Sequence, residues 1–300
     1  MRSRLSRSEW TIAVLLIVAA AGLLAWSIGL PGRLGRDGDA RTGPAAARQT
    51  LELLAAVVPA PGARGFPGWR RLARLGPPDP ATSGPLGFDG ERLFIRREDG
   101  PVVWNVGLLL DTSTAAVRPA ALLIECQPSD RRSPWVAREL REAWQGPCED
   151  SAGGWRARWR DPRLAAEIEA RARAVLGGHR PVDVPSELAD DYELLLDPLL
   201  AIEYAPPGDE SCGVARGRAA LERLLAAGRT DLVANVLRGL DPEGRVYAAE
   251  ALLTRGAVEP EDRSAADAVL ALEVPVRVRG GARRPARQAL VLSAAAPSAR

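Results

Sequence analysis

A run of residues without any charged side chain, Thr11–Leu30, is the feature that most restricts what this chain can fold into. It reads TIAVLLIVAAAGLLAWSIGL. A helix needs about 20 apolar residues to cross a hydrocarbon core of about 30 Å, and a helix satisfies its own backbone amides there. Trp10 and Trp26 place an indole near each end, as an interfacial aromatic belt does. We therefore predict a transmembrane helix at Thr11–Leu30 and contact with a membrane through it.

A cleaved signal peptide is the alternative reading of this segment, with a small-x-small site at Ala25-Trp26-Ser27. The apolar region of a signal peptide is usually about 7–15 residues, which is shorter, so an uncleaved anchor is favoured. Arginines flank both ends in nearly equal number, and the positive-inside rule therefore decides little. The short charged tail 1–10 favours a cytoplasmic amino end, a single pass through the cell membrane and a body outside the cytoplasm.

The composition fits a folded chain with no strong electrostatic partner. The 300 residues are 46% hydrophobic and 26% charged, with a formal net charge of +2. This excludes disorder as the dominant state and gives no reason to expect a nucleic-acid partner. Apart from His179, every basic residue is arginine. A GC-rich coding sequence produces the same bias together with abundant Ala, Gly and Pro, so arginine clusters carry less functional weight here.

Shifts in composition divide the chain into predicted segments. They are a tail (1–10), the transmembrane helix (11–30), a linker (31–44), a juxtamembrane helix and irregular segment (45–90), an α+β domain (91–210), and a helical subdomain with a strand-like tail (211–300). Apolar runs at Arg92–Arg96, Val102–Leu110 and Ala121–Cys126 predict strands, and Asp99-Gly100 between the first two is typical of a hairpin. The predicted fold class is therefore α+β: an N-terminal transmembrane helix, a small antiparallel sheet of about three strands, and a mainly helical C-terminal half.

Capping signals predict the helices of that C-terminal half. Ser133-Pro134, Asp161-Pro162, Ser186, Thr230, Asp241-Pro242 and Pro260 each stand at an expected helix start, and glycines follow several expected ends. Val274–Val278 has strand-like alternation, and Gly280-Gly281 is expected to turn the chain back toward Ala289–Leu292.

Residues 237–256, LRGLDPEGRVYAAEALLTRG, resemble one unit of a HEAT-type helical repeat. The matching residues are Asp241, Pro242, Arg245, Ala248, Ala249 and Leu252. The resemblance implies a helical, interaction-type subdomain. A stable array needs about three units, and further units are not visible in this sequence.

The three cysteines, Cys126, Cys148 and Cys212, fit either a disulfide or small apolar filling. An exported body favours pairing, and Cys126 with Cys148 is the nearer pair. None of them has the Cys-x-x-Cys spacing of a zinc or thioredoxin-type site, so neither a metal nor a cofactor is predicted.

Catalytic candidates are sparse. His179 is the sole histidine. The catalytic candidates are Cys148 as a nucleophile, His179 as a base and Asp191 as a carboxylate. No Gly-x-Ser-x-Gly, P-loop, Gly-x-Gly-x-x-Gly or His-Glu-x-x-His motif occurs. The acidic cluster at Asp190, Asp191 and Glu193 suits the first turn of a helix as well as it suits a cation.

The hexapeptide Trp155-Arg156-Ala157-Arg158-Trp159-Arg160 is the most unusual stretch. Alternating Trp and Arg predict a surface for an anionic headgroup or polymer, carried by Trp155, Arg156, Arg158, Trp159 and Arg160. The alternative is a strand or a helix lead-in that buries its indoles and stacks guanidinium groups on them.

Well-capped helices beside absent catalytic motifs favour a membrane-anchored interaction or scaffold protein of the cell envelope, with residues 216–272 facing a protein partner. The alternative is a divergent membrane-anchored hydrolase of envelope material, which requires Cys148, His179 and Asp191 to meet in one cleft.

Overall fold

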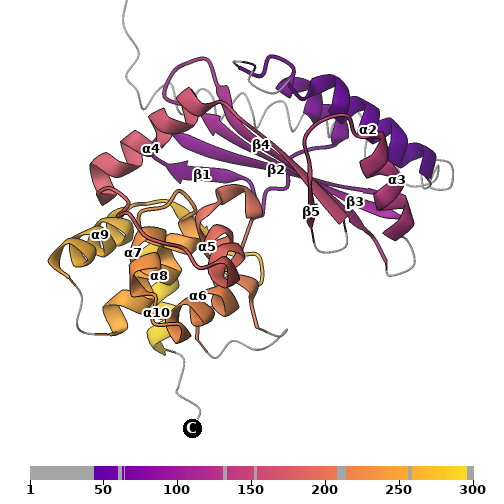
Figure 1. Cartoon of the computed structure of the whole chain (residues 1–300). Coiled ribbons are helices and arrows are strands. Elements are labelled where there is room, and N and C mark those ends of the chain that lie inside the picture. Colours follow the sequence, from indigo (N-terminus) through magenta and orange to yellow (C-terminus); the bar gives the residue numbers. More distant parts are fainter. Residues whose placement is uncertain are drawn as a thin grey trace, which may run out of the picture.

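The computed structural model describes residues 44–59, 63, 65–130, 134–151, 154–207, 214–255 and 259–295. It consists of one antiparallel sheet with a helical layer on one face and a larger helical body on the other (Figure 1). The sheet strands are β1 (Gly84–Gly87), β2 (Gly90–Asp99), β3 (Val102–Asp111), β4 (Arg118–Pro128), β5 (Glu149–Ser151) and β6 (Gly154–Arg160). Their order across the sheet is β1-β2-β3-β4-β6-β5.

The central hairpin of the sheet confirms the turn expected at Asp99-Gly100. β2 pairs with β3 from Gly90↔Asp111 to Asp99↔Val102 without a break. Gly100 has φ +60°, a left-handed conformation that glycine adopts without a steric penalty. The three predicted strands are therefore present and longer than predicted, and the hairpin sets their register.

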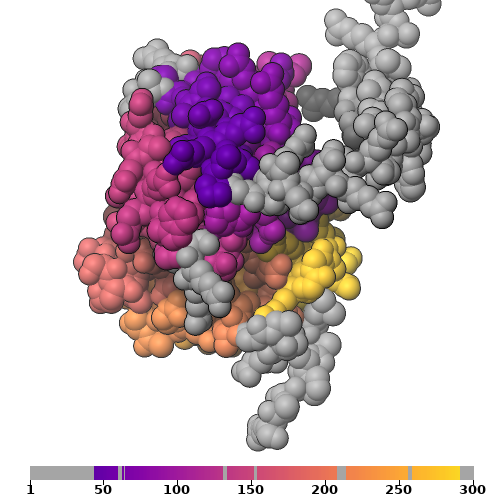
Figure 2. Space-filling model, turned by 90° about the vertical axis from the view of Figure 1, so that its right-hand side faces the viewer, coloured from indigo at the N-terminus to yellow at the C-terminus, as the bar shows by residue number. Residues whose placement is uncertain are grey.

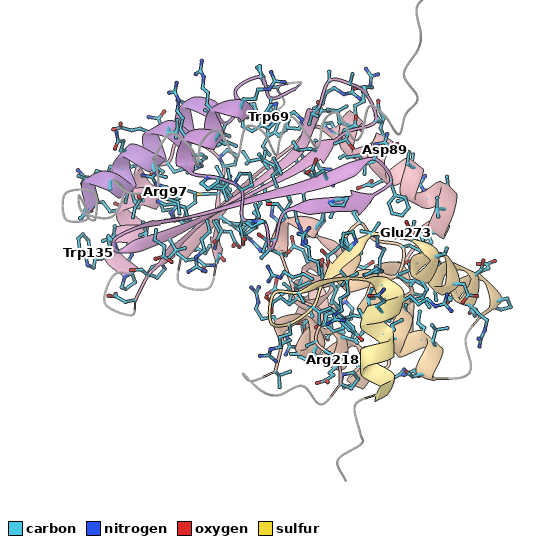
Figure 3. All side chains as sticks on the ribbon, turned by 180° about the vertical axis from the view of Figure 1, so that it is seen from behind. Trp69, Asp89, Arg97, Trp135, Arg218 and Glu273 are labelled. Atoms are coloured by element: carbon cyan, nitrogen blue, oxygen red, sulfur yellow. The ribbon has the colours of Figure 1, made fainter. Side chains whose placement is uncertain are left out.

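The outer layer covers the sheet face on which the even-numbered residues of β3 and of the β4 segment 122–126 lie. It contains α2 (Pro44–Val57), the 3₁₀ segment η2 (Trp69–Leu75) and α3 (Pro134–Ala143). Trp104, Ile124 and Trp155 pack there against Leu54 and Leu140. Figure 3 labels Trp69 and Trp135 in this layer, and Trp135 is 55% exposed at the outer end of α3.

The opposite face carries α4 (Pro162–Leu176) and the helical body. Leu109, Leu123, Ile168, Leu199 and Leu240 form the core between them. The body comprises η3 (Ser186–Leu188), α5 (Ala189–Leu196), η4 (Pro198–Leu200), α6 (Arg216–Ala226), α7 (Thr230–Val236), α8 (Pro242–Thr254), α9 (Pro260–Ala271), β7 (Pro275–Arg277), β8 (Arg283–Pro285) and α10 (Ala286–Ala295). In Figure 2 the indigo-to-magenta half of the molecule rests directly on the orange-to-yellow half.

α8 is the central helix of the body, and every residue from Pro242 to Leu252 is buried. It contacts α6, α7, α9, α10 and β7. The residues that carry the HEAT resemblance pack α8 against its neighbours. Ala248 and Ala249 are fully buried, while Asp241 and Arg245 are directed at the sheet half, through Arg92 and the Leu86 carbonyl respectively.

The predicted fold class is wrong as it was stated. The sheet has six strands where about three were predicted, and β1, β5 and β6 arise from short segments that lack long apolar runs. Within the residues that the structure describes, no helix is long and apolar enough to cross a membrane. The segment predicted to do so, Thr11–Leu30, lies outside the described residues, as do the tail and nearly all of the 31–44 linker.

The core of the helical body joins Leu195 and Ile202 to Leu221 and Leu224. Ala289–Leu292 is part of α10. The strand that returns from Gly280-Gly281 is β8, which pairs with β7 through Val276↔Arg284.

Candidate functional site

A pocket of about 400 Å³ lies on the sheet face that carries α4 and the helical body. β3, β4 and β6 form its floor, α4 one wall, α5 and η4 the other, and the chain between α7 and α8 closes one side. Figure 1 shows α4 and α5 on the same side of the sheet. The pocket is therefore built jointly by the two halves of the molecule.

Apolar side chains make up most of the inner surface. They come from β3, β4, α4, α5, η4 and the chain between α7 and α8: Leu109, Ala121, Leu123, Ala165, Ala172, Leu196, Leu199 and Leu240. Ala165 and Ala172 lie seven positions apart and therefore on one face of α4, the face that lines the pocket. The wall has small side chains at these two positions. Larger side chains at these two positions would occupy the space.

The amino end of α4 is fixed by a cap that the sequence predicted. Asp161 accepts hydrogen bonds from the backbone N–H of Arg163 (3.0 Å) and Leu164 (3.1 Å), and Pro162 is the first helical residue. Its carboxylate also accepts from the Gly65 N–H at 3.1 Å. Asp161 therefore holds the pocket wall in place relative to the outer layer.

The other end of α4 brings His179 to the pocket. The Gly177 N–H donates to the Arg173 carbonyl at 3.0 Å and ends the helix, and Gly177 has φ +83°. The chain then turns so that Gly177 and His179 both line the pocket beside Arg173 and Arg238.

Ion pairs between the walls and β6 organise the polar rim. Arg158 pairs with Glu193 (2.6 Å) and Asp197 (2.7 Å), which join the strand to α5, and Arg160 pairs with Glu169 of α4. Asp197 has a second role, because it accepts from the Leu199 N–H at 2.8 Å and caps η4. The rim carboxylates are thus already occupied by arginines.

The alternation of the hexapeptide explains these contacts. In β6, Trp155 and Trp159 point to the outer layer and are 0% and 6% exposed, while Arg156, Arg158 and Arg160 point to the opposite face. Arg156 also pairs with Glu149, at 2.6 Å. The buried indoles leave no exposed ring for a base or headgroup to stack on, and the three arginines already have carboxylate partners.

The catalytic candidates do not converge. His179 lines the pocket, but the Asp191 carboxylate accepts from Arg223 Nε of α6 at 2.6 Å. Cys148 packs against the core on the opposite face of the sheet. Sequence spacing could not reveal this separation, because it depends on how the sheet divides the molecule into two sides.

The candidate disulfide pair is unbonded in the structure. Cys126 and Cys148 are both free thiols, Cys126 fully buried in β4 and Cys148 half-buried beyond α3. Burial raises the pKa of the Cys126 thiol to about 12, although a hydrogen bond with Trp155 acts in the opposite direction. Cys212 lies outside the described residues.

No known protein family, curated protein or solved structure matches this chain. The chemistry of the pocket therefore has to be argued from its own residues. Among the residues that the structure describes, no group of three or more His, Cys, Asp or Glu side chains is placed to hold a metal ion.

Proposed function

We propose that this protein is a non-enzymatic binding module that takes an apolar ligand in the pocket between its sheet and its helical body. The observation that carries the proposal is the pocket itself: about 400 Å³, with an apolar floor and walls and a rim of charged residues. Small-molecule sites in proteins are concave, largely apolar, and about 300–1,000 Å³ in volume, with a few polar groups that fix orientation.

The chemistry of the lining favours binding over covalent catalysis. Among the described residues around the pocket there is no Ser, Thr, Cys, Tyr or Lys, the side chains that most often serve as nucleophiles. The rim carboxylates Glu169, Glu193 and Asp197 are held by arginines. The separation of Cys148, His179 and Asp191 also argues against the hydrolase alternative.

A ligand in this position contacts both halves of the molecule at once. Leu109 and Leu123 belong to the sheet, while Leu196 and Leu240 belong to the helical body. Binding should therefore stabilise the docked arrangement of the two halves, since a ligand that binds the folded state alone shifts the unfolding equilibrium toward that state.

The membrane location and the protein partner remain proposals beside this one. The apolar run Thr11–Leu30 supports attachment to a membrane, and the exposed faces of α6 and α9 are the accessible part of the 216–272 surface because α8 is enclosed. In this proposal a tethered body reports or presents a bound ligand to a neighbouring protein.

The test is a fluorescence titration of the full-length chain with the neutral apolar dye N-phenyl-1-naphthylamine. Ala172→Trp places an indole in the pocket wall, and Ala174→Trp adds the same indole to the exposed side of the same helix. We expect one saturable site in the parent and in Ala174→Trp and its loss in Ala172→Trp. Ala172→Leu is a smaller filling variant should the indole prevent folding. Equal dye binding by the parent and folded Ala172 variants contradicts the proposal.

A further inference from the structure

The charged groups around the pocket are not equally engaged. Glu193 and Asp197 are taken by Arg158, Glu169 by Arg160, and Arg238 by Asp262 at 2.7 Å. Arg173 and His179 are the exceptions among the charged and imidazole side chains that line it, because neither has an ion pair within the described part of the chain.

These two exceptions lie six positions apart in the sequence, at the carboxyl end of α4, and both line the pocket. Arg173 is in the last turn of α4, and His179 follows the glycine pair that ends this helix. Both side chains are exposed, so they are reachable from solvent. At the carboxyl end of α4 the pocket therefore provides hydrogen-bond donors and a positive charge that form no ion pair with a carboxylate of the described residues.

The remainder of the pocket offers no counterpart for a second charge. The interior is lined by Ala165, Ala172, Leu199 and Leu240. Arg158 and Arg160 are already paired with carboxylates of the protein. The complementary ligand carries one anionic group at one end and an apolar body behind it. A planar guanidinium matches the two oxygens of a carboxylate in a bidentate arrangement.

We propose that the ligand of this pocket is a carboxylic acid with an aliphatic tail, whose carboxylate is bound by Arg173 and His179. This inference rests on the proposed binding function and names its ligand class. The acid can be a free medium-chain acid or the C-terminus of an apolar peptide, since the two share the same terminal chemistry.

The test compares decanoate with decanol on the full-length chain by competition with N-phenyl-1-naphthylamine. The two ligands share a tail and differ in the charged end. We expect decanoate to compete about tenfold more strongly than decanol, the scale of one charge-assisted hydrogen bond. Arg173→Gln should remove this preference and leave decanol competition unchanged. Arg163→Gln, on the same helix but outside the pocket lining, is the matched control and should retain the preference.

The outcomes separate the two proposals. Equal competition by decanoate and decanol, or a preference that survives Arg173→Gln, overturns the assignment of the carboxylate and leaves the apolar site standing. Absence of saturable dye binding removes the proposed function as well. A short apolar peptide with a free C-terminus, beside its C-terminal amide, assigns the source: stronger competition by the peptide acid than by decanoate indicates a protein terminus, and weaker competition a free acid.

Discussion

Arg92 of β2 and Asp241 at the start of α8 are 149 positions apart in the sequence and form a fully buried ion pair of 3.0 Å. Arg92 also donates to Glu243 at 3.3 Å and to the carbonyls of Thr82 and Pro198. Asp241 in turn accepts from the Gly244 N–H at 2.7 Å and caps α8. The cap of the central helix and the docking of the sheet therefore use the same carboxylate.

Replacing Arg92 by Met should destabilise the protein strongly. The variant leaves Asp241 and Glu243 buried without the guanidinium, and removing one partner of a buried ion pair costs about 3–5 kcal/mol. The free energy of unfolding, measured by urea titration, checks this. Arg96→Gln, which removes an exposed pair with Glu98, should change it by less than about 1 kcal/mol. A loss for Arg92→Met no larger than that of the control would contradict the role assigned to Arg92.

Acid should reduce the penalty of Arg92→Met. Burial, and next the neighbouring Glu243, raise the pKa of Asp241 well above its ordinary value, while Arg92 lowers it. Without Arg92 the folded state prefers the protonated carboxyl still more strongly. A group whose pKa is raised by folding stabilises the folded state below its ordinary pKa and loses that effect as the pH rises. The difference in unfolding free energy between the parent and the variant should therefore shrink from pH 7 toward pH 4. A constant difference would show that Asp241 does not take up a proton.

Gly244→Ala should be among the most damaging single-methyl additions to the chain. A Cβ at this position would lie 1.9 Å from the carbonyl oxygen of Leu195, where α8 passes α5. The clash involves backbone atoms of both helices, so it cannot be removed by rotating a side chain. We expect the free energy of unfolding to fall by several kcal/mol, or the variant to fail to fold. Gly68→Ala, whose Cβ meets nothing closer than 3.4 Å, is the matched control. Comparable thermal midpoints for the two variants would contradict the close approach.

Asp161→Ala should cost about 1–2 kcal/mol of stability, because the substitution leaves the Arg163 and Leu164 N–H groups of α4 without their cap. The amino end of α4 should fray first, which hydrogen exchange of this segment would report. Asp161→Asn retains an acceptor oxygen and should recover most of the loss. An equal loss for both variants would point to the charge rather than to the cap.

The two described cysteines should differ in reactivity. Burial raises the pKa of Cys126 to about 12, so in the native protein at pH 8 it should resist iodoacetamide, while half-buried Cys148 reacts. Because folding raises this pKa, the contribution of Cys126 to stability is complete below its ordinary value of 9.0 and is lost as the pH rises toward 12. Peptide mapping after alkylation, with a denatured control, checks the order. A disulfide-linked Cys126–Cys148 peptide in the unreduced map would contradict the free-thiol structure.

Local signals predicted most of the described elements. Capping residues and prolines located the starts of α3, α4, α7, α8 and α9 to within about one residue, because Asp161, Asp241 and similar residues act on the turn that follows them. The Asp99-Gly100 hairpin was visible for the same reason. β1 and β5 were not visible, since a strand of three or four residues gains its stability from neighbours that are distant in sequence.

The sequence indicated some of the residues that line the pocket, but it did not predict the pocket itself. His179 and the Arg158–Arg160 segment were singled out by composition, and both line it. Ala165, Ala172 and Leu240 carried no signal, because small and apolar residues become a binding surface only where packing leaves space between them. Likewise the partners of Arg158 on α5 are 35 and 39 positions away, beyond any spacing rule.

The strict alternation of β6 also protects its own alignment. A shift of one residue against β4 would carry Trp155 and Trp159 to the side of α5 and force Arg156, Arg158 and Arg160 into the aromatic core. This mispairing should be strongly destabilising, because it would bury three guanidinium groups among aromatic rings. The alternation of β6 therefore favours a single register against β4, and this register also places the arginines on the side of the pocket.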